Sequence, residues 1–271
     1  MTGSDRDSLT GNRIEYRVDR DRRVVRRYWS TAERASWLGS SREAELAAHR
    51  LADHAGVAPR ITAIDVASQW IEIEWIDGIA VCFDQSIEPA IRPVLWSLLG
   101  KLRQLDPIGV PQLDVPDRIE VLLKRLCLID TRAWSTWASR WVALREHAAE
   151  YAALPTRLCL VHGDLVSGNL LQRADGRLFG IDWEYAHAGH PLEDLAGILV
   201  VSSELQSEWQ LAQRGAAEHP DWWPQATFDA LGCLDRTGQI RLLSWWIEAR
   251  RVLDGVWMAL AAHSAGNALD A

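Results

Sequence analysis

The feature of the sequence that most restricts its fold is a short hairpin pattern in the second half of the chain. An apolar run, Leu158–Val161, precedes a polar loop that ends at Asn169, and two short apolar runs then flank an Asp-Gly pair at 175–176. Asp-Gly between apolar runs is a strong signal for a β-hairpin. The returning run, Leu178–Ile181, leads directly into Asp182. We therefore expect the hairpin to bring Asp182 back beside the loop that holds Asn169.

The loop before the hairpin, residues 162–169, carries side chains that suit phosphoryl transfer. This reaction needs an acceptor for the proton of the attacking hydroxyl, and oxygen ligands for the divalent metal that accompanies a triphosphate. We expect Asp164 to orient and deprotonate the hydroxyl, and Asn169 and Asp182 to hold magnesium. The step of five residues from Asp164 to Asn169 equals that of the protein-kinase catalytic loop. The three residues in this order indicate a kinase-type centre that uses ATP and Mg²⁺.

His162 leaves a second chemistry open, because His-x-Asp also occurs in metal-dependent hydrolases. Such sites need further histidine and carboxylate ligands in matching clusters. The nearby candidates are His187 and His190, and an isolated His-x-x-His pair is usually incidental. A single carboxylate in this loop would be an ordinary surface residue. The joint spacing of two carboxylates and an amide favours the kinase chemistry.

The two halves of the chain differ in pattern. Four strand-like apolar runs come first: 14–18, 24–28, 61–66 and 70–75. Among them, Ser40 with a glutamate three residues later signals the start of a helix. The later part is mainly helical and includes a Trp-rich stretch over 238–263. We therefore expect an α+β fold of two lobes, a small antiparallel-sheet lobe over residues 1–75 and a larger helical lobe over residues 76–271.

Two motifs resemble those of the aminoglycoside phosphotransferase and choline kinase superfamily: His-Gly-Asp-Leu-Val-Ser-Gly-Asn at 162–169 and Ile-Asp-Trp-Glu-Tyr-Ala at 181–186. The second motif is particularly similar to that of the bacterial thiamine kinases. The resemblance covers nearly the whole chain and is sharp in these two motifs. It implies a protein-kinase-like fold and ATP-dependent phosphorylation of a hydroxyl on a small molecule.

The resemblance also assigns residues of the first lobe. Thr10, Gly11 and Asn12 match the loop over the phosphates. Arg26 matches the strand cation that binds phosphate, where lysine is more usual, and Glu45 matches the acidic partner of that cation. Judged from the residues alone, Arg26 is equally well explained as a solvated arginine of an Arg-rich strand, and Glu45 as a solvated residue of a charged helix.

The hinge between the lobes is expected near Glu74 and Ile76. By the resemblance, a backbone carbonyl and a backbone amide of this segment would pair with adenine. Arg26 lies two residues after Val24, so the two side chains are expected on the same face of a strand. This alternation would let Arg26 reach the cleft beneath the hinge.

Four residues are candidates for binding the phosphate acceptor: Glu184, Trp245, Trp246 and Glu248. Glu184 follows the predicted metal ligand by two positions, where many aminoglycoside phosphotransferases have glycine. An aromatic-plus-acid set suits a cationic acceptor, since a cation–π contact contributes about 0.5–2 kcal/mol. Tryptophans at helical spacing are more often core residues, and that explanation stays open.

These observations favour a kinase for a small cationic alcohol such as thiamine or choline. An aminoglycoside-type phosphotransferase is the first alternative, because the fold does not settle the acceptor. A nucleotide-binding scaffold without turnover is the second, suggested by Arg26 in place of lysine and by the single glycine of the phosphate loop.

The overall charge is consistent with a small-molecule enzyme. The chain has 29 basic and 37 acidic residues, a formal net charge of −8, which disfavours nucleic acid as a partner. The longest apolar run, Leu195–Val201, is far too short to span a bilayer, for which roughly 20 residues are needed. The four scattered cysteines are expected to be buried free thiols. The expected location is the cytoplasm.

Overall fold

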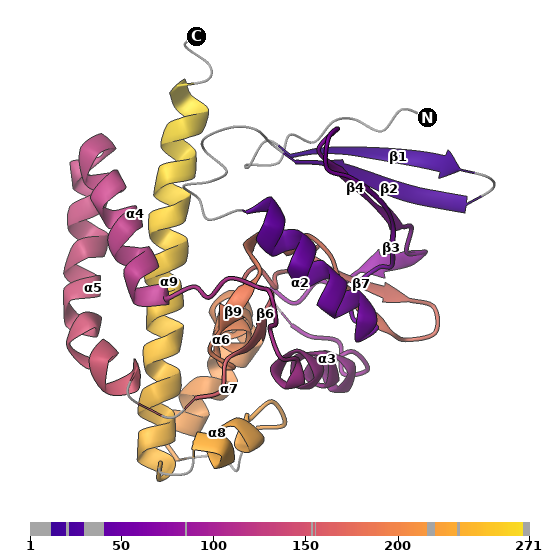
Figure 1. Ribbon diagram of the computed structural model, residues 1–271. Helices are drawn as coiled ribbons and strands as arrows, with labels where there is room; N and C mark the ends of the chain where they lie inside the picture. Colours follow the sequence, from indigo (N-terminus) through magenta and orange to yellow (C-terminus); the bar gives the residue numbers. More distant parts are fainter. Residues whose placement is uncertain are drawn as a thin grey trace. The chain divides into compact units, whose positions relative to one another are not determined.

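The computed structural model describes residues 12–19, 22–29, 41–84, 86–152, 154, 156–215, 220–231 and 234–267. Over these residues the chain is a mixture of helices and small antiparallel sheets, so the predicted α+β class is confirmed (Figure 1). Two compact units form, Met1–Pro111 with Cys159–Ala188 and Gln112–Leu158 with Gly189–Ala271.

These units are not divided at residue 75. The first unit takes in the hairpin of the catalytic segment, because that segment is bonded to the region after the first helix: the amide of Gly180 donates to the carbonyl of Val57 at 2.7 Å. The second unit is helical. The predicted division into lobes at residues 1–75 and 76–271 stays a prediction.

Four strands form the larger sheet of the first unit: β1 (Arg13–Asp19), β2 (Arg22–Tyr28), β3 (Ile61–Asp65) and β4 (Trp70–Glu74). Their order is β1-β2-β4-β3, and every neighbouring pair is antiparallel. The four predicted strand-like runs coincide with these strands. The cross-strand partners of Val25 are Tyr16 and Ile73, and the partners of Arg27 are Ile14 and Ile71.

Helix α2 (Arg42–His54) connects β2 to β3 and packs against β3. It begins one residue later than the sequence suggests, since the N-cap is Ser41, whose Oγ accepts from the amide of Ala44 at 3.3 Å. Glu45 and His49 lie one turn apart on its buried face. A helix places residues four apart on the same side, so both side chains point into the first unit.

His49 should make the stability of the protein depend on acid pH. Burial lowers the pKa of His49 from 6.5 to about 4, although Nε2 donates to the carbonyl of Pro59 at 2.8 Å. Between pH 6.5 and 4 the unfolded chain therefore binds more protons than the folded one, and roughly 3 kcal/mol of stability should be lost on acidification. Denaturant unfolding at several pH values measures this loss. His49→Gln, which keeps an N–H donor, should be less sensitive across that window, and an unchanged slope would contradict the assignment.

The rest of the first unit is built around the predicted hairpin. Its elements are β5 (Gly78–Ala80), α3 (Arg92–Gln104), β6 (Cys159–Val161), β7 (Leu170–Arg173), β8 (Leu178–Gly180), the 3-10 turn η1 (Trp183–Tyr185) and β9 (His187–Gly189). Strands β7 and β8 pair antiparallel, which confirms the hairpin, and β5 adds to the outer side of β7. No sequence pattern predicts β5, which is three residues long.

The described residues of the second unit form six helices: α4 (Val115–Ile129), α5 (Thr131–Ala152), α6 (Glu193–Val201), α7 (Ser203–Gln213), α8 (Gln225–Leu231) and α9 (Arg236–Asn267). Helices α4 and α5 pack on α9, the long terminal helix, and lie beside it in Figure 1. The predicted Trp-rich terminal stretch is one continuous helix. No helix in the described part of the chain is long and apolar enough to cross a membrane.

The cysteines are only partly as expected. Cys159 is buried and free, whereas Cys82 is free but exposed. Cys82 follows the short strand β5, all of whose residues are exposed, so the prediction of a buried thiol was wrong there.

Candidate active site

Asp164 and Asn169 are hydrogen-bonded to each other. Nδ2 of Asn169 donates to Oδ2 of Asp164 and to the Asp164 carbonyl, both at 2.9 Å. The amide of Asn169 also donates to the carbonyl of Val166 at 3.1 Å, which closes the loop between the two side chains. Because Nδ2 is used on Asp164, Oδ1 of Asn169 remains the acceptor that can face a metal.

The backbone of Ile181 connects this loop to Asp182. Its amide donates to the carbonyl of Asn169 at 2.9 Å, and its carbonyl accepts from Nε2 of His162 at 3.0 Å. Nδ1 of His162 in turn accepts from the amide of Asp164 at 3.3 Å. The ring is therefore the Nε2–H tautomer, in which one nitrogen is bonded to the loop of Asp164 and the other to the backbone just before Asp182. The structure brings the predicted base and both predicted metal ligands together within the first unit.

Gly163 is required at its position. Its φ is +81°, and a Cβ there would overlap with the carbonyl oxygen of Tyr185. Gly168 also has a positive φ, +93°, but nothing lies within 4 Å of a Cβ there.

Gly163→Ala should therefore be much more harmful than Gly168→Ala. A left-handed backbone conformation costs an alanine about 1–2 kcal/mol, which both variants incur. Only Gly163→Ala adds a steric overlap, worth about 1–3 kcal/mol more. Denaturant unfolding compares the two variants directly. Equal losses would show that the contact with Tyr185 is not a constraint.

Arg27 lies at the centre of three carboxylates. Its Nη1 lies 2.9 Å from Oε1 of Glu45 and 2.6 Å from Oδ1 of Asp182, and its Nη2 lies 2.7 Å from Oε2 of Glu184. The arginine side chain is only 11% exposed. The other oxygen of Glu45 accepts from Nε1 of Trp29 at 2.9 Å. Strand β2, helix α2 and the segment after β8 therefore meet at this guanidinium.

In this cluster, burial and the opposite charges of neighbouring groups shift the pKa values of Arg27 and Glu45 in opposite directions. Burial alone would lower the pKa of Arg27, but the charges of Glu45, Asp182 and Glu184 raise it above its ordinary value. Burial raises the pKa of Glu45, the Arg27 charge counteracts this, and the nearby charge of Asp182 adds to it. The cluster thus holds a permanent cation against several carboxylates, so it is a region of net negative charge that suits a further cation.

Arg26 does not have the predicted place beside Glu45. Its Nη2 binds Oε2 of Glu72 at 2.9 Å, and its guanidinium lies over the ring of Trp70, 3.7 Å from the centroid. Neighbouring residues of a strand point to opposite faces, so Arg26 and Arg27 cannot both face α2. The prediction that Arg26 faces Glu45 was wrong by one residue.

Asn12 and Glu184 form a pair that the sequence did not suggest. Nδ2 of Asn12 donates to Oε2 of Glu184 at 2.5 Å, the same oxygen that Arg27 approaches. Glu184 was expected to bind the acceptor, but this carboxylate oxygen is used inside the ion-pair cluster. Thr10 and Gly11 lie outside the described residues, so their predicted contact with phosphate stays a prediction.

The predicted hinge begins at the end of strand β4. The amide of Glu74 donates to the carbonyl of Arg60 at 2.9 Å, and the amide of Trp75 donates to the carbonyl of Arg23 at 3.1 Å. Ile76, which comes next, is buried. The pairing of Glu74 and Ile76 with adenine remains a prediction.

An apolar surface lies on the face of the sheet that carries Arg27. Tyr16 and Val25 are cross-strand partners on this face, and Ile14 is the partner of Arg27. The ring of Tyr16 meets that of Trp75 edge to face, with centroids 5.5 Å apart. Ile14, Tyr16 and Trp75 are all exposed. Exposed aromatic and apolar side chains beside a buried cation offer a surface on which a flat, apolar-faced ring can stack.

The predicted acceptor residues of the terminal helix are mostly packed inside the second unit. Nε1 of Trp245 donates to the carbonyl of Leu144 at 3.0 Å, and its ring packs on those of Tyr151 and Trp246. Trp245 and Trp246 are both buried. Glu248 is bonded to Arg251 one turn along the helix. These contacts account for the two tryptophans as core residues, which was the open alternative.

The donor set fits a magnesium ion. The described residues contain no group of three or more His, Cys, Asp or Glu side chains that could hold a metal. Magnesium, however, is usually held by one or two carboxylates together with substrate phosphates and waters. Asp182 and the amide oxygen of Asn169 match that need, beside a cluster in which carboxylates outnumber the cation.

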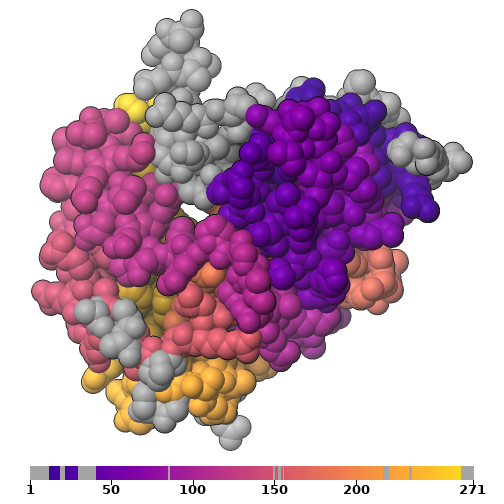
Figure 2. All heavy atoms as spheres, viewed as in Figure 1, coloured from indigo at the N-terminus to yellow at the C-terminus, as the bar shows by residue number. Residues whose placement is uncertain are grey.

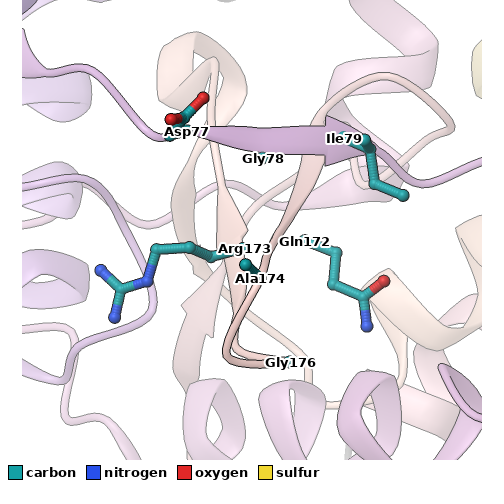
Figure 3. A pocket seen from close by; sticks show the side chains of 7 residues that line it. All are labelled: Asp77, Gly78, Ile79, Gln172, Arg173, Ala174 and Gly176. Atoms are coloured by element: carbon teal, nitrogen blue, oxygen red, sulfur yellow. The ribbon is translucent and has the colours of Figure 1, made fainter.

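A depression in the first unit lies away from these residues. It has a volume of about 480 Å³ and is lined by Asp77, Gly78, Ile79, Gln172, Arg173, Ala174 and Gly176 (Figure 3). These residues belong to β5 and to the turn end of the β7–β8 hairpin, whereas Asp182 follows its opposite end. The hairpin turn is visible at the surface beside the indigo and purple residues of the same unit (Figure 2). None of the predicted site residues lines this depression.

Taken together, a strand arginine paired with a helix glutamate and an Asp/Asn loop followed by a hairpin and an aspartate define a protein-kinase-like phosphotransferase. The family model described as the phosphotransferase enzyme family (APH) matches residues 8–227. The chain belongs to this family, which confirms the predicted enzyme class. Comparison with curated proteins finds no match.

Solved structures share the fold at low sequence identity. An ethanolamine kinase of Plasmodium vivax is 15% identical, with a TM-score of 0.63 over 95% of this chain and 75% of that one. The choline kinase LicA of Streptococcus pneumoniae is 17% identical, with a TM-score of 0.57 over 90% and 89%. A thermostable mutant of aminoglycoside phosphotransferase APH(4)-Ia, in a complex with ADP and hygromycin B, is 17% identical, with a TM-score of 0.59 over 98% and 94%.

Proposed function

We propose that the protein transfers the γ-phosphate of ATP to a hydroxyl group of a small, cationic molecule. The observation that carries this proposal is the connected set Asp164, Asn169 and Asp182, held together by the Asn169–Asp164 hydrogen bonds and by the Ile181–Asn169 backbone bond. Membership of the phosphotransferase family supports the reaction type. Neither line of support identifies the acceptor.

Asp164 is the residue that meets the acceptor hydroxyl in this proposal. Its Oδ2 is fixed by Asn169, so the carboxylate is oriented before the substrate arrives. Asp164 accepts the hydroxyl proton as the hydroxyl oxygen forms a bond to the γ-phosphorus and the bond to the leaving ADP breaks. A positioned base of this kind contributes about 10²–10⁴-fold to a rate.

Asn169 and Asp182 would hold magnesium, which supplies positive charge against the phosphate oxygens when it is bound. Arg27, whose Nη1 lies 2.6 Å from Oδ1 of Asp182, would add a second, protein-bound positive charge. Its guanidinium keeps its charge at any ordinary pH, and planar guanidinium groups match phosphate oxygens well. This assignment moves the predicted phosphate-binding role from Arg26 to Arg27.

The apolar face beside Arg27 would receive the adenine ring. Tyr16, Val25 and Trp75 lie on this face of the sheet or at its edge, next to the predicted hinge. A nucleotide bound there would have its base on apolar side chains and its phosphates toward the arginine. This arrangement also weakens the scaffold alternative, since a strand cation paired with the helix glutamate is present after all.

The acceptor is best sought among amino alcohols. The acidic chain favours a cation, and similar solved structures are named as ethanolamine and choline kinases. An aminoglycoside is the second candidate, because the neighbour of TM-score 0.59 carries hygromycin B. Thiamine is a candidate acceptor only because of the motif at 181–186.

An acceptor screen tests this proposal. The purified protein is incubated with labelled ATP and magnesium together with choline, ethanolamine, thiamine, simple sugars or aminoglycosides. We expect labelled product from one of the amino alcohols and none without magnesium. Transfer only to aminoglycosides would establish the second candidate. Binding of ATP without transfer to any alcohol in a broad panel would favour a scaffold.

A further inference from the structure

Oε2 of Glu184 receives two donors from different parts of the first unit. Nδ2 of Asn12 lies 2.5 Å away and Nη2 of Arg27 lies 2.7 Å away. Asn12 is only 3% exposed and Glu184 only 6% exposed. Asn12 immediately precedes β1, and Glu184 lies in η1, two residues after Asp182. A single carboxylate oxygen therefore connects the start of the sheet to the metal-binding segment.

We propose that Asn12 is a positioning residue of the phosphotransfer site: its amide fixes Glu184, and Glu184 fixes Arg27 beside Asp182. The proposal rests on the proposed function, which it deepens. In this proposal Glu184 holds the phosphate-binding cation, Arg27, and does not bind the acceptor. The side chain of Asn12 binds Glu184 in this proposal, and not the phosphates of the nucleotide.

The two terminal nitrogens of the Arg27 guanidinium have different partners, and this difference explains why Glu184 must be held in place. Nη1 is shared by Glu45 and Asp182, whereas Nη2 is held by Glu184. A metal ion held by Asp182 and a phosphate near Arg27 would compete with the contact between Nη1 of Arg27 and the Asp182 carboxylate. Glu184 then keeps the other end of Arg27 in place. Without Asn12, Oε2 of Glu184 loses the hydrogen bond from that amide, and the position of Arg27 becomes less defined.

An amide is suited to this place. It donates a hydrogen bond without adding charge to a cluster in which carboxylates already outnumber the cation. A carboxylate at position 12 would instead face Glu184 across a hydrogen-bond distance, and like charges so close and so deeply buried repel strongly. Asn12→Asp should therefore be worse than Asn12→Ala, although aspartate is the closer match in shape.

Substitution of Asn12 should weaken the binding of MgATP more than it slows proton transfer to Asp164. Asp164 and Asn169 are hydrogen-bonded to each other within the loop at 162–169, whereas Glu184 holds Arg27, so we expect the loss at the cation rather than at the base. For Asn12→Ala we expect the KM for MgATP to rise about tenfold or more, the size of one hydrogen bond to a charged group, while kcat falls less. A residue that merely stabilised the fold would lower the active fraction and leave the KM unchanged.

The test combines steady-state kinetics with equilibrium binding of the magnesium complex of a non-hydrolysable ATP analogue. The variants are Asn12→Ala, Asn12→Asp, Glu184→Gln and the double variant Asn12→Ala/Glu184→Gln. In the double variant the two losses should not add, because both break the same link. Asn12→Gln, which keeps the amide but displaces it, serves if Asn12→Ala does not fold. Glu15→Gln is the matched control, since Glu15 lies three residues after Asn12, within β1, and accepts from the hydroxyl of Tyr28 at 2.9 Å. The control should behave as the wild type.

The outcomes separate this proposal from the proposed function. A wild type that transfers phosphate, with variants at Asn12 that keep its KM and its affinity for the analogue, would overturn the positioning role. A wild type that binds the analogue without transferring phosphate would refute the function, and the positioning role would then stand or fall on whether Asn12→Ala weakens that binding. A wild type that does not bind the analogue would overturn both.

Discussion

Asp164→Asn should lower the rate of phosphate transfer by about 10²–10⁴-fold, the contribution of a positioned general base. The substituted amide can still accept the hydrogen bond from Nδ2 of Asn169, so the loop should keep its shape. What it loses is the ability to take the proton of the attacking hydroxyl. Steady-state turnover with the acceptor found in the screen measures the loss. Binding of the non-hydrolysable ATP analogue should remain nearly as tight as in the wild type.

Asp175→Asn is the matched control for this prediction. It removes a carboxylate from the hairpin that follows the loop of Asp164, at the exposed turn, where Asp175 binds Arg173 and Arg177. That variant should retain wild-type turnover. If Asp164→Asn also retained full turnover, Asp164 would not be the base and the proposed reaction would need another one.

Arg27→Met should destabilise the protein by about 3–5 kcal/mol, the usual cost of removing one partner from a buried ion pair. It leaves Glu45, Asp182 and Glu184 close together without their shared cation. Glu45 is only 1% exposed, and burial already raises its pKa. Without Arg27 this pKa should rise further, so the folded state would bind more protons than the unfolded state. The deficit should therefore be largest near neutral pH and smaller toward pH 5.

Arg26→Met provides the comparison on the opposite face of the same strand. Arg26 has one carboxylate partner, Glu72, and stacks on Trp70. Its loss leaves one carboxylate rather than three, so the free energy of unfolding should fall by much less. Denaturant unfolding of both variants at pH 5 and pH 7 makes the comparison. Equal losses for the two variants, or no pH dependence for Arg27→Met, would contradict the role of Arg27 as the centre of the cluster.

The contrast between Arg26 and Arg27 shows how far the sequence can be read. The apolar runs predict the strand itself. Val24, which is buried on the same face as Arg26, suggests the wrong face of this strand as the one that points to the site. A shift of one residue in a strand reverses the face of every side chain. The informative signal was the alternation of Val25, Arg27 and Trp29, the last of which binds Glu45. It was hidden because the arginines of this strand occur in adjacent pairs, at 22–23 and 26–27, so both faces of the strand carry one.

The hairpin could be predicted because its determinants are local. An Asp-Gly pair fixes the turn, the turn fixes the register of β7 and β8, and the register returns Asp182 to the loop of Asp164. The partners of Glu184 depend on a contact across 172 residues of chain, from Asn12, which no local pattern encodes. The burial of Trp245 similarly depends on Leu144 and Tyr151 of another helix.

A crystal structure with manganese and a non-hydrolysable ATP analogue tests the central claim most directly. Anomalous scattering locates the metal without reference to any assumed ligand. We predict a metal peak within coordination distance of the Asp182 carboxylate and Oδ1 of Asn169, with the terminal phosphate between Arg27 and Asp164. Metal and phosphate bound away from these side chains would contradict the assignment of the phosphotransfer centre.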